Sequence, residues 1–321
     1  MALSETQLIE RFLRDLGARR NDTVLGIGDD AALLQVPAGS ELVLTTDALV
    51  EAVHFLPGAA PRALGHRALA VNLSDIAAMG AQPCWALLSL NLPAVDETWL
   101  HEFTGGFGAL ARTHAVALVG GNLSRGALSI TVTLAGVVPS GQALRRDGAR
   151  PGDELYLSGS VGDAACGLKL LRAEVAAAAA EAAYLQGRFE YPSPRSALGL
   201  GLRAVASACI DVSDGVYLDA TRLLAASGCA ATLPIESLPL SPALRQVLGE
   251  QAWRCALGGG EDYELCFTAP ASQAGAIAAL ATRIGVPLTR VGSVCAGSGL
   301  KLTRAGSVMQ FSPLGFDHFD R

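Results

Sequence analysis

Five short polar clusters constrain this chain most, because each lies where a strand-like run ends or a helix-like run begins. Any one cluster has the ordinary composition of a turn, since Asp, Asn and Gly all favour turns. Five together indicate a shared ligand site, because open α/β sheets bind ligands at the carboxyl ends of their strands. The clusters are 26–30 (GIGDD), 45–47 (TTD), 120–126 (GGNLSRG), 211–215 (DVSDG) and 258–264 (GGGEDYE).

Strand-like and helix-like runs mix along the chain, which predicts an α/β (α+β) fold. The predicted strands are 41–47, 85–93, 115–122, 128–139, 153–159, 207–215 and 263–269. The predicted helices are 61–80, 96–113, 161–184 and 216–228, the third including the alanine tract 176–180. A further helix is predicted before Gly17, with a capping box at Ser4 and Gln7.

The length of 321 residues suits two domains rather than one. The pattern restarts near Pro151, after the charged stretch LRRDGAR, so a boundary is expected around 145–152. We place an N-terminal domain at 1–148 and a C-terminal domain at 149–321.

Charge and cysteine usage exclude several classes of protein. The net charge of −6 argues against a general nucleic-acid binder, because the phosphate backbone attracts basic surfaces. The seven cysteines are odd in number and show no CxxC spacing, which is typical of reduced thiols in a cytoplasmic protein. The N-terminus does not have the pattern of a signal peptide, and no apolar run is long enough to cross a membrane, so a soluble protein is expected.

Asp75 is unusual because it lies among apolar residues in the predicted helix 61–80. Asn72 precedes it by three residues, so the two share one helix face. This stripe is either the solvated side of the helix or a metal ligand aimed at the acidic turns, and the spacing alone leaves both interpretations open.

Hard oxygen donors with few histidines favour Mg²⁺ or Mn²⁺ over zinc. Two unit charges about 4 Å apart interact by about 4 kcal/mol at an effective dielectric near 20. Many carboxylates therefore converge only around cations, and such cations attract polyanions such as nucleotide phosphates. The adjacent pair Asp29 and Asp30 is explained by the same reasoning.

Two familiar phosphate-binding patterns fail on inspection. Gly162 and Gly167 have P-loop spacing, but Leu168 and Lys169 occupy the required Lys and Ser/Thr positions. The run GIGDDA matches a dinucleotide pattern, yet its two aspartates would repel a pyrophosphate. The chain has only two lysines, so metal and arginine are expected to neutralise phosphate. Arg146, near the expected boundary, is the best-placed arginine, and a solvated surface charge is the alternative.

Seven strings occur here in the order seen in bacterial thiamine-monophosphate kinases. They cover nearly the whole chain, which resembles that family and its superfamily of aminoimidazole ribonucleotide and selenophosphate synthetases. The strings are GIGDDAALL, LTTDALVEAVHF, ALAVNLSDIAAMGAQP, LVGGNLSRG, DVSDGVYLD, GGGEDYELCFT and GFDHF.

The resemblance implies a fold and a set of residue roles. It implies that the N-terminal α/β domain (1–148) binds ATP and Mg²⁺ and helps form a homodimer. It implies that the C-terminal α/β domain (149–321) completes the nucleotide and substrate site, with ATP and several Mg²⁺ ions between the two domains and no P-loop. It implies metal ligation by Asp30, Thr45, Thr46, Asp47, Asp75, Asp211 and Asp214, with Asp47, Asp75, Asp211 and Asp214 catalytic. It implies nucleotide contacts by Gly121, Asn122, Arg146 and Ser213, and contacts to thiamine monophosphate by His54, Glu261 and Phe316.

One departure from the family concerns Asn122, because many members carry Asp there. The amide brings no charge, so we assign it to the nucleotide rather than to a metal. The implied reaction is direct transfer of the ATP γ-phosphoryl group to thiamine monophosphate. The alternatives are a sister synthetase with another small acceptor and a non-catalytic nucleotide-binding protein. A selenophosphate synthetase is disfavoured because the first cysteine is Cys84.

Overall fold

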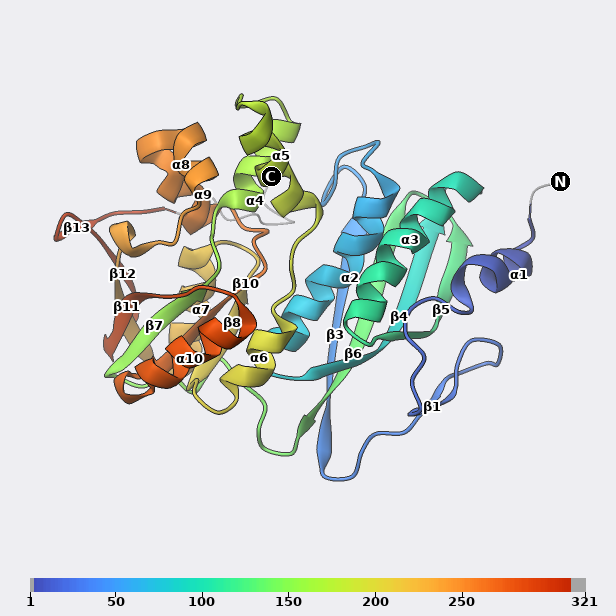
Figure 1. Cartoon of the computed structure of the whole chain (residues 1–321), viewed down its shortest axis with the longest axis horizontal. Helices are drawn as coiled ribbons and strands as arrows, with labels where there is room; N and C mark the ends of the chain where they lie inside the picture. Colours follow the sequence, from blue (N-terminus) through green and yellow to red (C-terminus); the bar gives the residue numbers. More distant parts are fainter. Residues whose placement is uncertain (1–2, 313–321) are drawn as a thin grey trace. The chain divides into compact units, whose positions relative to one another are not determined.

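The computed structural model describes residues 3–312 and divides into two compact units. Unit 1 runs to Ile76 and resumes over Ala81–Ala143. Unit 2 comprises Ala77–Gly80 and the chain from Leu144 onward. Both units combine helices and sheets, which confirms the predicted α/β class (Figure 1). The functional division at 148 stays a prediction. No helix within residues 3–312 is long and apolar enough to span a membrane.

Unit 1 is built around one four-stranded sheet in the order β3-β6-β4-β5, in which only β4 and β5 are parallel. The predicted capping box is present, with the Ser4 side chain accepting from the Gln7 N–H group. The elements are α1 (Glu5–Leu8), the π-helix η1 (Ile9–Leu13), β1 (Thr23–Leu25), β2 (Leu33–Leu34), β3 (Ser40–Val50), α2 (Pro61–Ala78), β4 (Gln82–Leu92), α3 (Glu97–Thr113), β5 (Ala117–Arg125) and β6 (Ser129–Pro139).

Helices α2 and α3 cover one face of this sheet and form the core of unit 1 with it (Figure 1). Leu69 and Phe103 of the helices pack in one cluster with Leu90 and Val132 of the strands. The two helices approach closely through glycine, because a Cβ atom at Gly65 would lie 2.0 Å from the carbonyl oxygen of Phe103. The opposite face of the sheet carries exposed apolar side chains.

Unit 2 contains a seven-stranded sheet in the order β13-β12-β9-β11-β7-β10-β8, and only β12 and β9 are parallel. Its strands are β7 (Asp153–Ser158), β8 (Ala208–Val212), β9 (Cys229–Pro234), β10 (Glu264–Pro270), β11 (Leu288–Ala296), β12 (Gly299–Arg304) and β13 (Ser307–Met309). Its α-helices are α4 (Asp163–Leu171), α5 (Ala179–Glu190), α6 (Ser196–Leu202), α7 (Val216–Ser227), α8 (Pro242–Leu248), α9 (Ala252–Gly258) and α10 (Ala274–Ile284). Short 3-10 turns are η2 (Ile235–Ser237), η3 (Gly249–Gln251) and η4 (Ala271–Gln273).

Successive residues of a strand point to opposite faces, so the sheet of unit 2 has a core on each face. Leu157 of β7 packs in the cluster that contains α7 and α9. Its neighbour Tyr156 packs in the cluster that contains α6 and α10, where its ring stacks on Phe267 at 5.2 Å. The sheet of unit 2 is therefore covered by helices on both faces.

The prediction of one helix over 161–184 is wrong in its middle. Helix α4 ends at Leu171, α5 begins at Ala179, and Ala173 has a left-handed φ of 56°. The two helices pack so closely that a Cβ atom at Gly167 would lie 2.1 Å from the carbonyl oxygen of Leu185. Folding back in this way requires a turn, and the packing overrides the helix propensity of alanine.

All seven cysteines are free thiols, in agreement with their scattered spacing. Six are buried, and only Cys295 on β11 is exposed. Burial raises the pKa of Cys166 to about 11 and that of Cys255 to about 12. These two thiols therefore stay protonated at neutral pH.

Candidate active site

Two polar residues interrupt the buried row of β3. Val43 and Leu49 on this strand pack into the core beneath α2 and α3. Thr45 and Asp47 lie between them at the same spacing of two residues, so all four side chains lie on the helix-covered face of the sheet. Burying a polar side chain on such a row costs free energy unless the side chain is hydrogen-bonded or binds a charged partner.

Asp75 of α2 faces this row. The Thr45 hydroxyl donates to the Asp75 carboxylate at 2.5 Å, which joins strand and helix directly. Asn72, one turn earlier, is fully buried, and its Nδ2 group donates to the Ala68 carbonyl at 3.0 Å. Its Oδ1 atom is buried without a hydrogen-bond partner. The structure thus brings together Thr45 and Asp75, with Asp47 on the same face.

Thr46 points to the other face of the sheet. Its hydroxyl donates to the Val132 carbonyl at 3.2 Å and lies 3.0 Å from the Thr133 hydroxyl. The side chains of Thr45 and Thr46 therefore do not converge, although the two residues are adjacent in the sequence.

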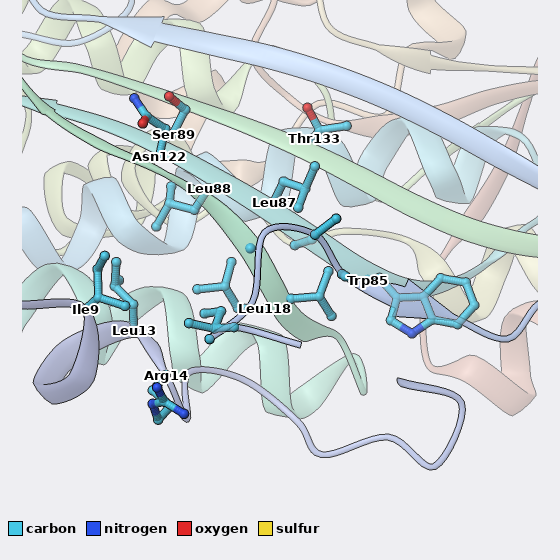
Figure 2. Close-up of a pocket in the computed structure, with 18 of the residues that line it drawn as sticks. Ile9, Leu13, Arg14, Trp85, Leu87, Leu88, Ser89, Leu118, Asn122 and Thr133 are labelled. Atoms are coloured by element: carbon cyan, nitrogen blue, oxygen red, sulfur yellow. The ribbon is translucent and has the colours of Figure 1, made fainter. Parts of the chain in front are cut away.

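A cavity of about 1140 Å³ collects the glycine-rich turns of unit 1. Asp29 and Asp30 line it together with Gly121 and Asn122. Asn122 pairs with Ser89 across the β4–β5 ladder, and Figure 2 shows the two side chains beside one another. The clusters 26–30 and 120–126 thus meet at one cavity.

Gly121 is required by the backbone at this cavity. Its φ is +144°, and a Cβ atom there would lie 1.9 Å from the carbonyl oxygen of Leu88 on the neighbouring strand. A side chain would therefore separate β4 from β5. Because residue 121 is glycine, no side chain covers the backbone of edge strand β5 at this point.

His54 is held by a local hydrogen bond. The N–H group of Val50 donates to its Nδ1 atom at 3.0 Å. Because Nδ1 accepts, the neutral ring carries its proton on Nε2. This tautomer suits a residue that donates a hydrogen bond to an anionic ligand.

The turn after β8 brings three acidic residues of unit 2 together. Asp211 is buried at the end of the strand, and Ser213 and Asp214 follow in the turn. The buried carboxylate of Asp219 accepts from the N–H groups of Ser213 and Asp214 at 3.1 and 2.9 Å. Burial raises the pKa of Asp219 to about 6. Arg222 bonds to both Asp214 and Asp219, so the turn is fixed from one side.

The glycine-rich loop 258–264 is hydrogen-bonded to this turn. The Glu261 N–H group donates to the Ser213 carbonyl at 2.8 Å, and the Tyr263 N–H group donates to the Val212 carbonyl at 2.9 Å. A Cβ atom at Gly260 would lie 2.5 Å from the Ser213 carbonyl oxygen. Four of the predicted site residues of unit 2 therefore lie together: Asp211, Ser213, Asp214 and Glu261.

Asp262 occupies the donors that a P-loop would offer to phosphate. Its carboxylate accepts from the N–H groups of Gly162 and Ala164 at 2.6 and 3.2 Å. The N-terminus of α4 is thus capped from within, in agreement with our rejection of 162–169 as a P-loop. Asp262 is almost fully buried, and burial raises its pKa to about 8.

The two remaining predicted site residues are Arg146 and Phe316. Arg146 is exposed, and its carbonyl accepts a hydrogen bond from the Ser227 hydroxyl at 2.7 Å. Phe316 lies outside the described residues, so its predicted contact stays a prediction.

Sequence reasoning missed three residues that shape the site: Asp219, Arg222 and Asp262. Asp219 and Asp262 lie inside the strings DVSDGVYLD and GGGEDYELCFT, so their types were visible, but their inward orientation was not. Within residues 3–312, no group of three or more His, Cys, Asp or Glu is arranged to hold a metal ion. The carboxylates are instead distributed over the two units.

The chain is similar to known proteins along nearly its whole length. Residues 28–138 match the model described as AIR synthase related protein, N-terminal domain. The chain is 45% identical over 322 aligned residues to the thiamine-monophosphate kinase of Salmonella typhimurium, covering 99% of both chains.

Two solved structures agree with this similarity. The crystal structure of thiamine-monophosphate kinase from Stenotrophomonas maltophilia K279a matches with a TM-score of 0.86 at 46% identity, covering 96% of this chain and 99% of that one. AaThiL complexed with AMPPCP and TMP matches with a TM-score of 0.79 at 35% identity, covering 91% and 92%.

Proposed function

The chain belongs to the thiamine-monophosphate kinase family, and from this premise we propose that it phosphorylates thiamine monophosphate with ATP. The products are thiamine diphosphate and ADP. Full-length similarity to kinases of this one activity carries the proposal. A relative complexed with AMPPCP and TMP supports both substrates.

The chemistry suits a site rich in carboxylates. The acceptor is a phosphate monoester whose second pKa is about 6, so it is largely ionised near neutral pH and needs no strong base. One of its oxygens forms a bond to the γ-phosphorus of ATP as the bond from that phosphorus to the β,γ-bridging oxygen breaks. Catalysis is then mainly the positioning and neutralisation of two polyanions.

The side chains of both units have assigned roles in this reaction. We assign catalysis to Asp47, Asp75, Asp211 and Asp214, and nucleotide binding to Gly121, Asn122, Arg146 and Ser213. We assign thiamine monophosphate binding to His54, Glu261 and Phe316. The Nε2–H tautomer of His54 supports a hydrogen bond to the substrate phosphate. The Glu261 carboxylate suits the cationic thiazolium or the aminopyrimidine.

The donor set fits Mg²⁺, because hydroxyl and carboxylate oxygens are its preferred protein ligands. When bound, Mg²⁺ supplies charge neutralisation on the transferring phosphates. Thr46 fits least, since its hydroxyl is bonded within the sheet. Asp214 is already paired with Arg222, so a cation there competes with the guanidinium. The proposed ligands are Asp30, Thr45, Thr46, Asp47, Asp75, Asp211 and Asp214.

The direct test incubates the purified protein with ATP, thiamine monophosphate and Mg²⁺ and measures thiamine diphosphate by chromatography. Asp75→Asn keeps an acceptor for the Thr45 hydroxyl and removes the charge, so we expect a folded protein with turnover reduced at least a hundredfold. Asp96→Asn is the matched control, because Asn caps helix α3 as well as Asp does.

The outcomes of this assay separate the alternatives. No diphosphate product from folded wild-type protein contradicts the proposed function, and ATP binding without turnover then favours a non-catalytic nucleotide-binding protein. Near-normal activity of Asp75→Asn, with the wild type active, removes Asp75 from the catalytic set and leaves the function intact.

The face of the unit 1 sheet opposite helices α2 and α3 supports a homodimer. Leu42, Leu44 and Leu87 lie on this face with 46%, 63% and 43% of their surface exposed. A monomer rarely leaves such neighbouring leucines in water. Leu44→Glu should shift the molar mass measured by light scattering from dimer to monomer. Val308→Glu, at a 56% exposed position on β13, should leave the dimer intact.

We also place the protein in the cytoplasm. The seven free thiols support a reducing compartment, because thiols at such density commonly form disulfides elsewhere. The acidic net charge supports small-molecule substrates rather than nucleic acid.

A further inference from the structure

The loop that carries Glu261 has an unusual backbone. Gly260, Glu261 and Tyr263 have φ angles of 67°, 68° and 51°. The left-handed region is free for glycine but costs a residue with a side chain about 1 kcal/mol or more. Two such residues within three positions persist only if surrounding contacts enforce them.

The Asp262 side chain joins this loop to helix α4. Its side chain turns inward while Glu261 stays partly exposed. The Asp262 carboxylate binds the N–H groups of Gly162 and Ala164 at the start of α4. These N–H groups have no partner within their own helix, so the carboxylate satisfies them and the helix holds the loop in return.

Tyr263 fixes the Glu261 side chain. The Tyr263 hydroxyl donates to Oε2 of Glu261 at 2.9 Å, and the tyrosine itself is buried, with 9% of its surface exposed. A buried ring restricts where its hydroxyl can lie. The Glu261 carboxylate is therefore directed by a rigid neighbour two residues away.

We propose that Asp262 and Tyr263 are positioning residues that hold Glu261 in the orientation required to bind thiamine monophosphate. Asp262 sets the backbone of the loop, and Tyr263 sets the carboxylate. This inference rests on the proposed function, in which Glu261 contacts the substrate. In this proposal both residues act on the substrate only through Glu261.

The test compares Michaelis constants for the two substrates. Tyr263→Phe keeps the packing and removes one hydrogen bond, so KM for thiamine monophosphate should rise about two- to tenfold. In Asp262→Asn the amide NH₂ faces a backbone N–H group, and the rise should be about tenfold or more. KM for ATP should stay within about twofold in both variants.

Asp153→Asn is the matched control. Asp153 is also buried in unit 2 and accepts from the Arg150 N–H group at 2.9 Å and from the Ser207 hydroxyl at 2.6 Å. Asp153→Asn should lower the stability of the protein about as much as Asp262→Asn does, without changing the ratio of the two KM values. Amide hydrogen exchange over 258–264 should accelerate in Asp262→Asn and stay slow in the control.

Each result decides between specific positioning and general support of the fold. An unchanged KM for thiamine monophosphate in folded Asp262→Asn or Tyr263→Phe overturns the inference while the wild-type activity stands. Equal rises in both KM values also overturn it. If Asp262→Asn does not fold, Tyr263→Phe decides alone. If the wild type makes no thiamine diphosphate, the proposed function fails, and the exchange data still test whether Asp262 holds the loop.

Discussion

Replacing Glu264 with Gln tests whether unit 2 depends on a buried charge cluster. Glu264 is fully buried at the start of β10. It accepts from Ser158 Oγ at 2.5 Å, Arg188 Nη2 at 2.8 Å and Arg195 Nε at 2.6 Å. The two arginine side chains are only 13% and 17% exposed, so solvent screens the pairs weakly. Gln keeps the shape but leaves both guanidinium groups without their shared counter-ion.

The expected loss of folding free energy follows from the burial of these side chains. Removing one partner of a buried ion pair costs about 3–5 kcal/mol. At 1.4 kcal/mol per factor of ten, this raises the ratio of unfolded to folded unit 2 by roughly a hundred- to several-thousandfold. Glu174→Gln is the control, since Glu174 and its partner Lys169 are each 44% exposed and 3.3 Å apart. A surface pair of this kind is worth about 1 kcal/mol or less.

The assay must report on unit 2 alone, because a chain of two units need not unfold in one step. Native-state amide hydrogen exchange in peptides from β7 and β10 gives the local free energy of opening. Our reasoning is refuted if Glu264→Gln lowers the local free energy of opening by no more than Glu174→Gln does. Such a result would mean that Glu264 is not the counter-ion of Arg188 and Arg195.

Three further predictions concern single residues, two of them in unit 1 and one in unit 2. Burial, and to a lesser degree the charge of His66, lowers the pKa of His114 below its ordinary value of 6.5. The unfolded chain then binds the proton more readily, so stability falls as the pH decreases below about 6.5, and His114→Gln should flatten this slope in urea titrations. Gly121→Ala should cost several kcal/mol and abolish nucleotide binding, because its Cβ would collide with the Leu88 carbonyl. Gly187→Ala in α5, where nothing lies within 4 Å, should instead stabilise the protein by up to about 1 kcal/mol in thermal unfolding; equal effects of the two glycine changes would contradict the structure.

Elements with a strong periodic pattern were predictable from the sequence. The helix at 61–80 and the strand at 128–139 agree with α2 and β6 to within two residues. Their apolar positions match the period of the element and the face that it buries. The strands β9, β11, β12 and β13 were not predicted, although together they form more than half of the unit 2 sheet.

The candidate site was predictable in residue type but not in orientation. The alternation along β3 could have separated Thr45 from Thr46, because neighbouring strand residues face opposite sides. Nothing in the sequence could show that Asp219 and Asp262 turn inward to bind backbone N–H groups. That choice depends on which segment of the chain lies beside each carboxylate, and this is a property of the tertiary fold.

The distribution of thiols gives the native chain one natural attachment point. A maleimide reagent requires an accessible thiolate, and six of the seven sulfur atoms are shielded from solvent. Cys295 alone should be modified in the folded state, so no other cysteine needs to be replaced before labelling. A fluorophore or spin label attached there would report on unit 2 in the unaltered sequence, and the appearance of further labelled positions would give a direct measure of unfolding.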